Sequence, residues 1–241
     1  MNESMQHRVP TSLAVPIENM GMLVIDPARV GLMQVQNFDA EAGRKQMTAF
    51  MTRMLALCAR RRQAEALLLI KKVHSLTPQQ QMYPMDEIIT EVCTEIAMSR
   101  TELDVFQQNP QVLTMFVPGY GEKRLNGLMI GLLLAELCLF TKAMCARFDV
   151  PCTTSCSFST YDGHEGKFHP QTFALPVGDE GLPQILIPRA LLVHRIDSSV
   201  HDYWQQVARD FGGEHYRGAL LKSRALSAAL ADPGRLRLYF A

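Results

Sequence analysis

Residues 40–62, AEAGRKQMTAFMTRMLALCARRR, decide how the first half of this chain is interpreted. Apolar residues recur at helical spacing, so that one arc of a helix would carry all of them. They are Met47, Phe50, Met51, Met54, Leu55, Leu57 and Cys58. Asp39 stands directly before this segment, where a carboxylate can cap the first turn. We therefore predict a helix over residues 40–62.

Two apolar runs flank this helix. GMLVID at 21–26 is short, contains β-branched residues and stops at an Asp-Pro pair, which is typical of a buried strand. ALLLIKKV at 66–73 is also short and apolar, and it is a second strand candidate. Strand, helix and strand in this order are typical of a parallel βαβ unit.

The rest of the chain is less regular. We expect a helix at 86–99 and a strand at 112–117, while 125–148 fits either one long buried helix or a strand at 128–134 followed by a helix. After Pro151 we expect strands at 152–161 and 184–187, then helices at 202–211 and 216–230. The predicted fold is mixed α/β: an N-terminal βαβ-type parallel sheet with helices, then an irregular β-hairpin region and C-terminal helices. We treat 1–241 as one composite domain, within which 1–150 would form the α/β core and 151–241 the hairpin and helical tail.

Composition narrows the class of protein. The 24 basic and 24 acidic residues cancel, so bulk charge does not hold this chain to nucleic acid. Six cysteines in 241 residues are too few for a disulfide scaffold. The most apolar stretch, 125–140, contains Glu136 and is shorter than the roughly 20 residues of a membrane span. The first residues carry no apolar signal segment, so we expect a cytoplasmic protein without a membrane partner.

Positive charge is nevertheless concentrated locally. Lys45, Arg53 and Arg60 recur at spacings of eight and seven, opposite the apolar arc of the predicted helix, and Arg61 and Arg62 extend the charge at its end. A C-terminal group comprises Arg217, Lys222, Arg224, Arg235 and Arg237. Such faces could follow the phosphates of a nucleic acid or meet a protein partner, a second copy of the chain included. The alternative is an ordinary solvated helix face.

Four thiols and imidazoles after Pro151 have the composition of a zinc site. Cys152, Cys156, His164 and His169 fall within 18 residues and could complete a tetrahedral set of ligands. If 152–161 is a regular strand, however, its two cysteines lie roughly 13 Å apart, because a strand rises about 3.3 Å per residue. The alternative is that the cysteines lie on one face of a strand and the histidines in a hairpin loop.

A cysteine nucleophile is the third hypothesis. Asp26 ends the first predicted strand, and Cys138 would open a helix if 128–134 is a strand, where a thiol has a depressed pKa. In segments 21–75 and 127–160 the chain resembles the isochorismatase-like cysteine hydrolases, whose Asp and Cys follow strands in this manner. The resemblance implies catalysis by Cys138 with Asp26. The chain departs from that family in two ways. The Gly-to-Cys spacing is one residue longer, and the lysine that the family has well before its cysteine is missing, because no lysine occurs between Val73 and Glu122.

The chain lacks the usual phosphate-binding loops and the G-x-S-x-G nucleophile motif. We therefore expect a non-catalytic binding or assembly subunit that contacts nucleic acid or a protein partner through basic helix faces. The alternative is a cysteine-dependent hydrolase or transferase that uses Cys138 with Asp26.

Overall fold

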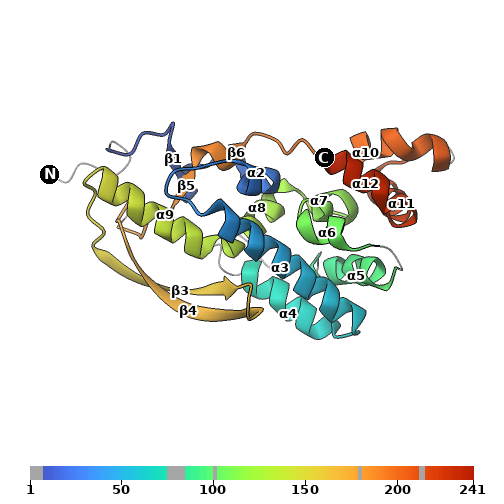
Figure 1. Cartoon of the computed structure of the whole chain (residues 1–241), viewed down its shortest axis with the longest axis horizontal. Helices are drawn as coiled ribbons and strands as arrows, with labels where there is room; N and C mark the ends of the chain where they lie inside the picture. Colours follow the sequence, from blue (N-terminus) through green and yellow to red (C-terminus); the bar gives the residue numbers. More distant parts are fainter. Residues whose placement is uncertain (1–7, 75–84, 100–101, 179–180, 212–214) are drawn as a thin grey trace. The chain divides into compact units, whose positions relative to one another are not determined.

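The computed structural model describes residues 8–74, 85–99, 102–178, 181–211 and 215–241 (Figure 1). Helices account for 59% of the described residues and strands for 14%, so the fold is a mixture of both, with helices predominant. The chain divides into two compact units, each made of two separate stretches. Residues 1–47 and 129–195 form the first unit, and residues 48–128 and 196–241 form the second. Each unit contains residues from both sides of position 150.

The first unit contains every strand of the described residues. Its elements are β1 (Ala14–Pro16), η1 (Ile17–Asn19), β2 (Val24–Ile25), α2 (Pro27–Leu32), the start of α3 (Ala40–Ala59), the end of α8 (Glu122–Leu132), α9 (Leu134–Arg147), β3 (Thr154–Asp162), β4 (Lys167–Leu175), β5 (Leu186–Pro188), η2 (Arg189–Leu191) and β6 (Leu192–Val193). Within the described residues, these strands form three two-stranded sheets, β1–β5, β2–β6 and β3–β4, and every pairing is antiparallel.

The predicted parallel βαβ sheet is therefore wrong. The strand expected at 21–26 exists as β2, but its partner is β6 in antiparallel pairing. The segment 66–73 lies inside a helix, α4 (Gln63–His74), which buries Ala66, Ile70 and Val73. Their spacing of four and three residues is the helical period, and Ala, Leu and Lys are strong helix formers. These features outweigh the strand-like length of the apolar run.

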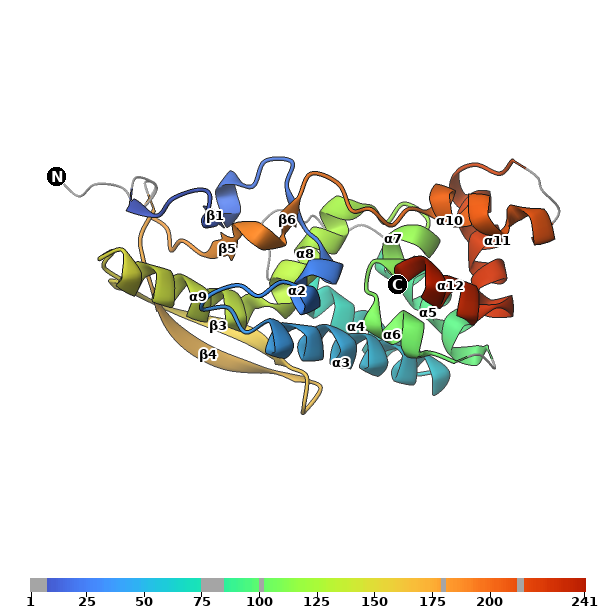
Figure 2. The ribbon, with the colours of Figure 1, turned by 45° about the horizontal axis from the view of Figure 1, so that its top comes forward.

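The second unit is helical. Its elements are most of α3, then α4, α5 (Met85–Met98), α6 (Asp104–Gln108), α7 (Val112–Phe116), the start of α8, α10 (Val200–Val207), η3 (Ala208–Phe211), α11 (Gly218–Ala231) and α12 (Pro233–Phe240). The helices expected at 86–99, 202–211 and 216–230 are confirmed as α5, as α10 with η3, and as α11. The strand expected at 112–117 is wrong, because this segment forms α7 and buries four of its five residues. Helices α10, α11 and α7 pack together in this unit (Figure 2).

Helix α3 confirms the predicted helix but ends at Ala59, three residues before the predicted end. All seven residues of its apolar arc are buried. The carboxylate of Asp39 accepts a hydrogen bond from the backbone N–H of Ala42 at 2.9 Å. At the other end, Arg61 adopts a left-handed conformation, with φ of 56°. The N–H groups of Arg61 and Arg62 then donate to the carbonyls of Cys58 and Leu57, which is the hydrogen-bond pattern of a Schellman ending.

The apolar segment 125–148 forms neither of the two predicted arrangements. It lies within two helices, α8 and α9, which meet near Leu133 at an angle of 72°. Among the described residues, no single helix is long and apolar enough to cross a membrane, although α8 and α9 meet the length and composition criteria as a bent pair. Thr141 of α9 accepts a hydrogen bond from the backbone N–H of Leu186, which holds β5 beside this helix.

The β3–β4 hairpin confirms the strand expected at 152–161. It packs along α9 in the first unit (Figure 1). Its turn is closed by the Asp162 carboxylate, which accepts hydrogen bonds from the N–H groups of His164 and Glu165. Gly166 has a φ of 65°, a conformation that residues with a Cβ rarely adopt. Gln46 of α3 accepts a hydrogen bond of 2.6 Å from the N–H of Gly163, so the tip of the hairpin is attached to the helix.

One carboxyl group lies in the apolar interior of the first unit. Glu136 of α9 is 8% exposed, and burial raises its pKa above the ordinary 4.5. A raised carboxyl pKa stabilises the fold below the unfolded-state pKa, and that contribution is lost as the pH rises through the folded-state pKa.

We therefore predict that Glu136→Gln raises the free energy of unfolding at neutral pH, because the amide carries no charge to bury. The gain over the unsubstituted protein should shrink toward zero as the pH falls below 4.5. Urea unfolding at a series of pH values measures the gain in stability at neutral pH and its decrease at low pH. Glu91→Gln, on the exposed side of α5, should change stability by less than about 0.5 kcal/mol at any pH. A pH-independent effect of Glu136→Gln would contradict this account.

Candidate functional site

The exposed side of α3 carries the cations that the sequence placed there. Arg53 and Arg60 are exposed and seven residues apart, which places them two helical turns apart on one side. Arg60 lies just past the last residue of α3, but its N–H still donates to the carbonyl of Ala56, so it continues the helical path. Among the described residues, no acidic side chain forms an ion pair with Arg53, Arg60 or Arg61.

The other two predicted cations of this region are engaged locally. Lys45 pairs with Glu41 at 2.6 Å, and Arg62 forms a two-pronged pair with Glu65. These pairs lie at the two ends of a long interval without acids. Between Glu41 and Glu65 the sequence contains Arg44, Lys45 and four further arginines but no Asp or Glu. The middle and end of α3 therefore carry uncompensated positive charge.

The C-terminal basic group does not form a common face. Lys222 is turned into the second unit, where its ammonium donates to the carbonyls of Thr114, Val117 and Tyr120 at 2.6, 2.8 and 3.2 Å. These carbonyls belong to the end of α7 and the turn after it, so Lys222 satisfies a helix terminus. Burial lowers the pKa of this amine to about 8. The ammonium that was expected to meet a partner is thus bound to carbonyls of the same unit.

The remaining cations of this group differ in their surroundings. Arg235 pairs with Asp210 and Asp232, and Arg237 pairs with Glu102 and Asp104. The guanidinium of Arg224 lies over the ring of Tyr216, 5.6 Å from its centre, while Arg217 is exposed at the start of α11. Arg235 and Arg237 are exposed as well, so Arg217 and Arg224 are the members of this group that are exposed and form no ion pair within the described residues.

Cys138 lies where a nucleophile could not be reached. It sits in the second turn of α9 rather than at the first residue of a helix, and it is fully buried. The pKa of its thiol is raised to about 12. Burial is the largest cause, and the nearby Cys156 and Glu136 raise the pKa by smaller amounts. A thiol with this pKa carries almost no thiolate at neutral pH, and thiolate is the reactive form.

Asp26 has a structural role instead. It is the N-cap of α2, and its carboxylate accepts a hydrogen bond from the N–H of Ala28 at 3.0 Å. It also lies 3.8 Å from the guanidinium of Arg29. The short strand β2 thus ends in a helix cap, which explains the Asp-Pro pair without catalysis.

The four residues of the predicted zinc site are not brought together. Cys156 pairs with Phe173 across the hairpin, whereas His169 pairs with Thr160, four residues further along β3. Four residues of strand span roughly 13 Å, as expected for a regular strand. Cys152 precedes β3 and interacts with Cys145 at the end of α9. His164 lies in the turn and is exposed.

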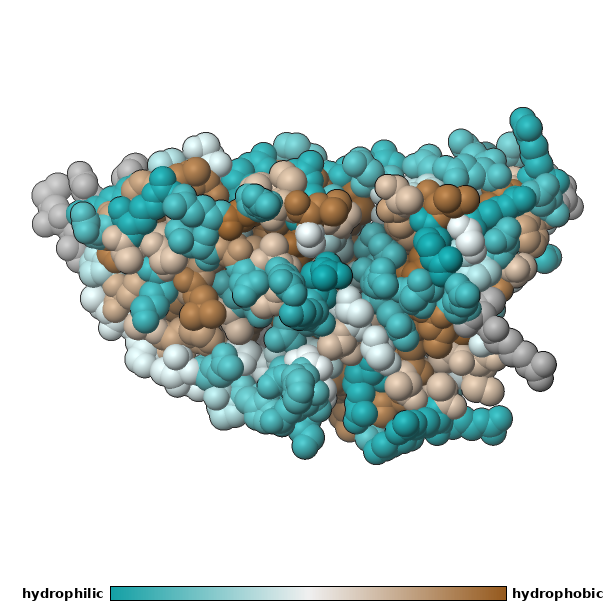
Figure 3. Space-filling model, viewed as in Figure 1, coloured by the Kyte–Doolittle hydropathy of each residue, from teal (hydrophilic) through white to brown (hydrophobic). Residues whose placement is uncertain are grey.

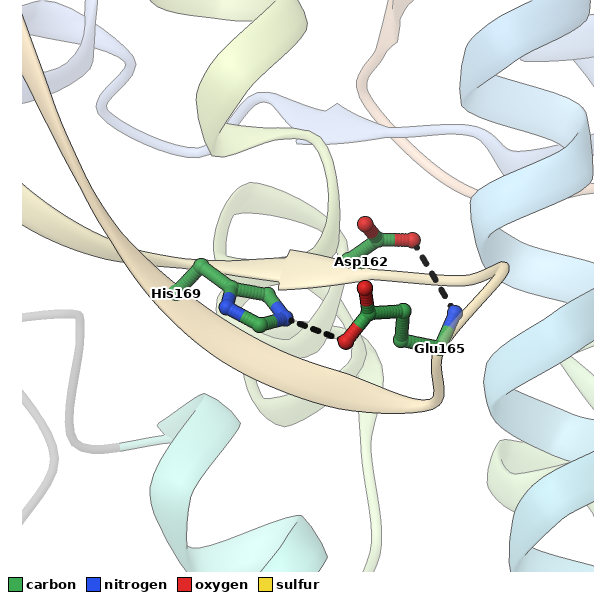
Figure 4. A group of neighbouring side chains, drawn as sticks. All are labelled: Asp162, Glu165 and His169. Atoms are coloured by element: carbon green, nitrogen blue, oxygen red, sulfur yellow. Dashed lines mark hydrogen bonds and ion pairs between the residues drawn. The ribbon is translucent and has the colours of Figure 1, made fainter.

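The hairpin instead gathers His169 with two carboxylates. One ligand atom each from Asp162, Glu165 and His169 lie within 4.8 Å of one another. In Figure 4 the side chains of Glu165 and His169 point toward one another, with Nε2 of the imidazole 3.1 Å from a carboxylate oxygen. The backbone N–H groups of Glu165 and His164 lower the pKa of Asp162, so this carboxylate is ionised at neutral pH.

Sequence reasoning identified one member of this group and missed two. The signal for the other two was a spacing of three and four residues, from Asp162 to Glu165 to His169, across a turn that contains Gly163 and Gly166. It also missed a buried pair in the second unit, where Nδ1 of His74 lies 3.4 Å from the carboxylate of Asp86. No motif links these two residues, since they come from the facing helices α4 and α5.

Comparisons with known proteins supply no activity. Residues 85–198 match a family described as "Domain of unknown function (DUF8370)". No curated protein matches the chain. No solved structure matches it either. The matched segment contains the β3–β4 hairpin with its carboxylate and imidazole group but not α3.

The position of Lys222 leads to a prediction about stability. Lys222→Met should lower the free energy of unfolding by about 2 kcal/mol or more, because three carbonyls lose their donor while the methionine keeps the apolar stem. Guanidinium unfolding followed by circular dichroism measures this. Arg217→Gln, at the exposed start of the same helix, should change stability by less than about 0.5 kcal/mol. Equal effects of the two substitutions would contradict the assigned role of Lys222.

The burial of Cys138 leads to a prediction about reactivity. In the folded protein at neutral pH, iodoacetamide should label the half-buried Cys152 well before Cys138, as peptide mass spectrometry would measure. Unfolding in guanidinium should make the two thiols equally reactive. Preferential labelling of Cys138 in the folded state would show that its thiol is open and activated.

Proposed function

We propose that this protein is a non-catalytic binding subunit that contacts the phosphate backbone of nucleic acid through the exposed side of α3. The observation that carries the proposal is that Arg53, Arg60 and Arg61 are exposed, lack acidic partners among the described residues, and lie within an interval of sequence that contains no acids. Guanidinium groups bind phosphate through two parallel hydrogen bonds, so exposed arginines suit this ligand.

The dimensions of the helix support a backbone contact. Residues seven apart on a helix lie roughly 10.5 Å apart along its axis, at about 1.5 Å per residue. This distance lets Arg53 and Arg60 reach separate phosphates of one strand. The exposed residues directly before each of these arginines, Thr52 and Ala59, are small, so a polyanion can approach the helix closely.

The apolar side of α3 makes this orientation obligatory. Because its buried arc includes Phe50, Met54 and Leu57, the helix cannot rotate to hide its arginines without exposing that arc. The charge is thus presented in one direction. Binding of this kind depends on local charge, so a net charge of zero for the whole chain does not oppose it.

Two further expectations belong to this proposal. A cytoplasmic location is favoured by the six cysteines, none of which forms a disulfide in the structure. Catalysis by Cys138 is not part of the proposal, because the burial and raised pKa of its thiol oppose it.

The test is a salt titration of binding. Fluorescence anisotropy with short labelled duplex DNA and RNA should show affinity that falls as potassium chloride is raised from about 50 to about 200 mM. The double variant Arg53→Gln with Arg60→Gln should bind about tenfold more weakly at the lower salt. It should also reduce the slope of log Kd against log salt concentration by about 2, because two phosphate contacts are lost.

A matched double variant controls for net charge. Lys142→Gln with Arg195→Gln removes two exposed cations from the first unit and leaves α3 unchanged, so it should keep the affinity and the slope. If both double variants weaken binding equally, the contact is not made by α3. Absence of binding, or binding insensitive to salt, would overturn the proposal. The exposed side of α3 would then be expected to contact a protein instead of nucleic acid.

A further inference from the structure

We infer that the β3–β4 hairpin holds a divalent transition-metal ion, Zn²⁺ by its ligand chemistry, between Asp162, Glu165 and His169. The first argument is strand geometry. Asp162 lies two residues beyond Thr160 on β3, and Thr160 is the cross-strand partner of His169. Residues two apart in a strand share a face, as do cross-strand partners, so Asp162 and His169 are diagonal neighbours on one face.

The turn adds the third ligand. The chain reverses through residues 163–166, and the side chain of Glu165 folds back over the same face toward His169 (Figure 4). The ligand atoms of the three residues lie within 4.8 Å of one another. Ligand atoms at about 2.0–2.2 Å from one ion lie at most about 4.4 Å apart, so these side chains need only a small inward movement to bind an ion together.

The hairpin holds these groups in place without relying on a ligand. One oxygen of Asp162, Oδ1, accepts hydrogen bonds of 2.8 and 3.2 Å from the turn, which leaves Oδ2 outside these two bonds. The adjacent Gly163 donates to Gln46 of α3, which fixes the tip of the hairpin against a helix. A site whose ligands are already positioned loses little conformational entropy when the ion binds.

The imidazole of His169 provides an independent indication of a ligand. Its Nε2 atom is shielded from solvent, and within the described structure it has no hydrogen-bond partner of acceptable geometry. The Glu165 oxygen lies 3.1 Å from this nitrogen, and the side chain of His169 as a whole is 42% exposed. A cation between the three groups would give the shielded nitrogen a partner and the two carboxylates a counter-charge.

The donor set selects the class of ion. Two carboxylate oxygens and an imidazole nitrogen suit zinc and its neighbours, whereas magnesium and calcium prefer oxygen alone. Three protein ligands leave a fourth tetrahedral position for water. The thiols of Cys152 and Cys156 are not required, and the hairpin register keeps Cys156 roughly 13 Å along the strand from His169.

Isothermal titration of the metal-free full-length protein with zinc chloride tests this site. We expect one ion per chain, and His169→Gln or Asp162→Asn should weaken binding at least tenfold. Asp162→Asn keeps an oxygen that can accept the hydrogen bonds of the turn, so the hairpin should stay folded. His164→Gln, in the same turn, should bind zinc as the unsubstituted protein does.

Cysteine variants separate this site from one that uses thiolates. Cys152→Ser with Cys156→Ser should leave zinc affinity unchanged, and cobalt substituted for zinc should show no thiolate-to-metal charge-transfer absorption. Loss of binding in the cysteine variant, or the appearance of that absorption, would overturn the assignment. So would the absence of stoichiometric zinc binding, or affinity that Asp162→Asn and His169→Gln leave unchanged.

Discussion

Burial of the apolar arc of α3 is the constraint on which the rest of the argument depends. A helix with seven buried residues on one side has a fixed rotation about its axis, and its other side must face solvent. The arginines of α3 therefore have one orientation available to them. The Schellman ending at Arg61 stops the helix before α4 begins, so Arg60 and Arg61 lie at the end of α3.

The same helix also positions the β3–β4 hairpin. Gln46 lies on α3 one residue before the apolar arc begins, and it accepts a hydrogen bond from the turn of the hairpin. The turn in turn orients Asp162 and Glu165. The turn that carries the carboxylate and imidazole group is thus attached to α3 within the first unit. Figure 3 shows one face of the molecule, on which hydrophobic residues are scattered among hydrophilic ones.

Lys222 shows how a charge count can mislead. In the sequence it is one of five basic residues near the C-terminus, and counting them suggested a surface for anions. In the structure its ammonium meets three carbonyls at the end of α7, and Arg235 and Arg237 are paired with acids from other segments. A buried or paired cation contributes little to the field outside the protein. Sequence alone gives the number of charges, whereas their availability depends on partners that are distant along the chain.

The sequence by itself determined the local features of this protein: the helix at α3 with its cap at Asp39, the helix at α5, the hairpin strand near 154–162 and the helices after residue 200. These follow from periodicity and capping, which act between residues a few positions apart. Only the tertiary structure decided that 66–73 is helical, that every sheet is antiparallel within the described residues, and that His169 meets carboxylates instead of thiols. Strand partners are chosen by long-range packing, and the ligand group depends on the register of the hairpin. Short apolar runs such as 66–73 satisfy either period until a neighbouring helix buries one face.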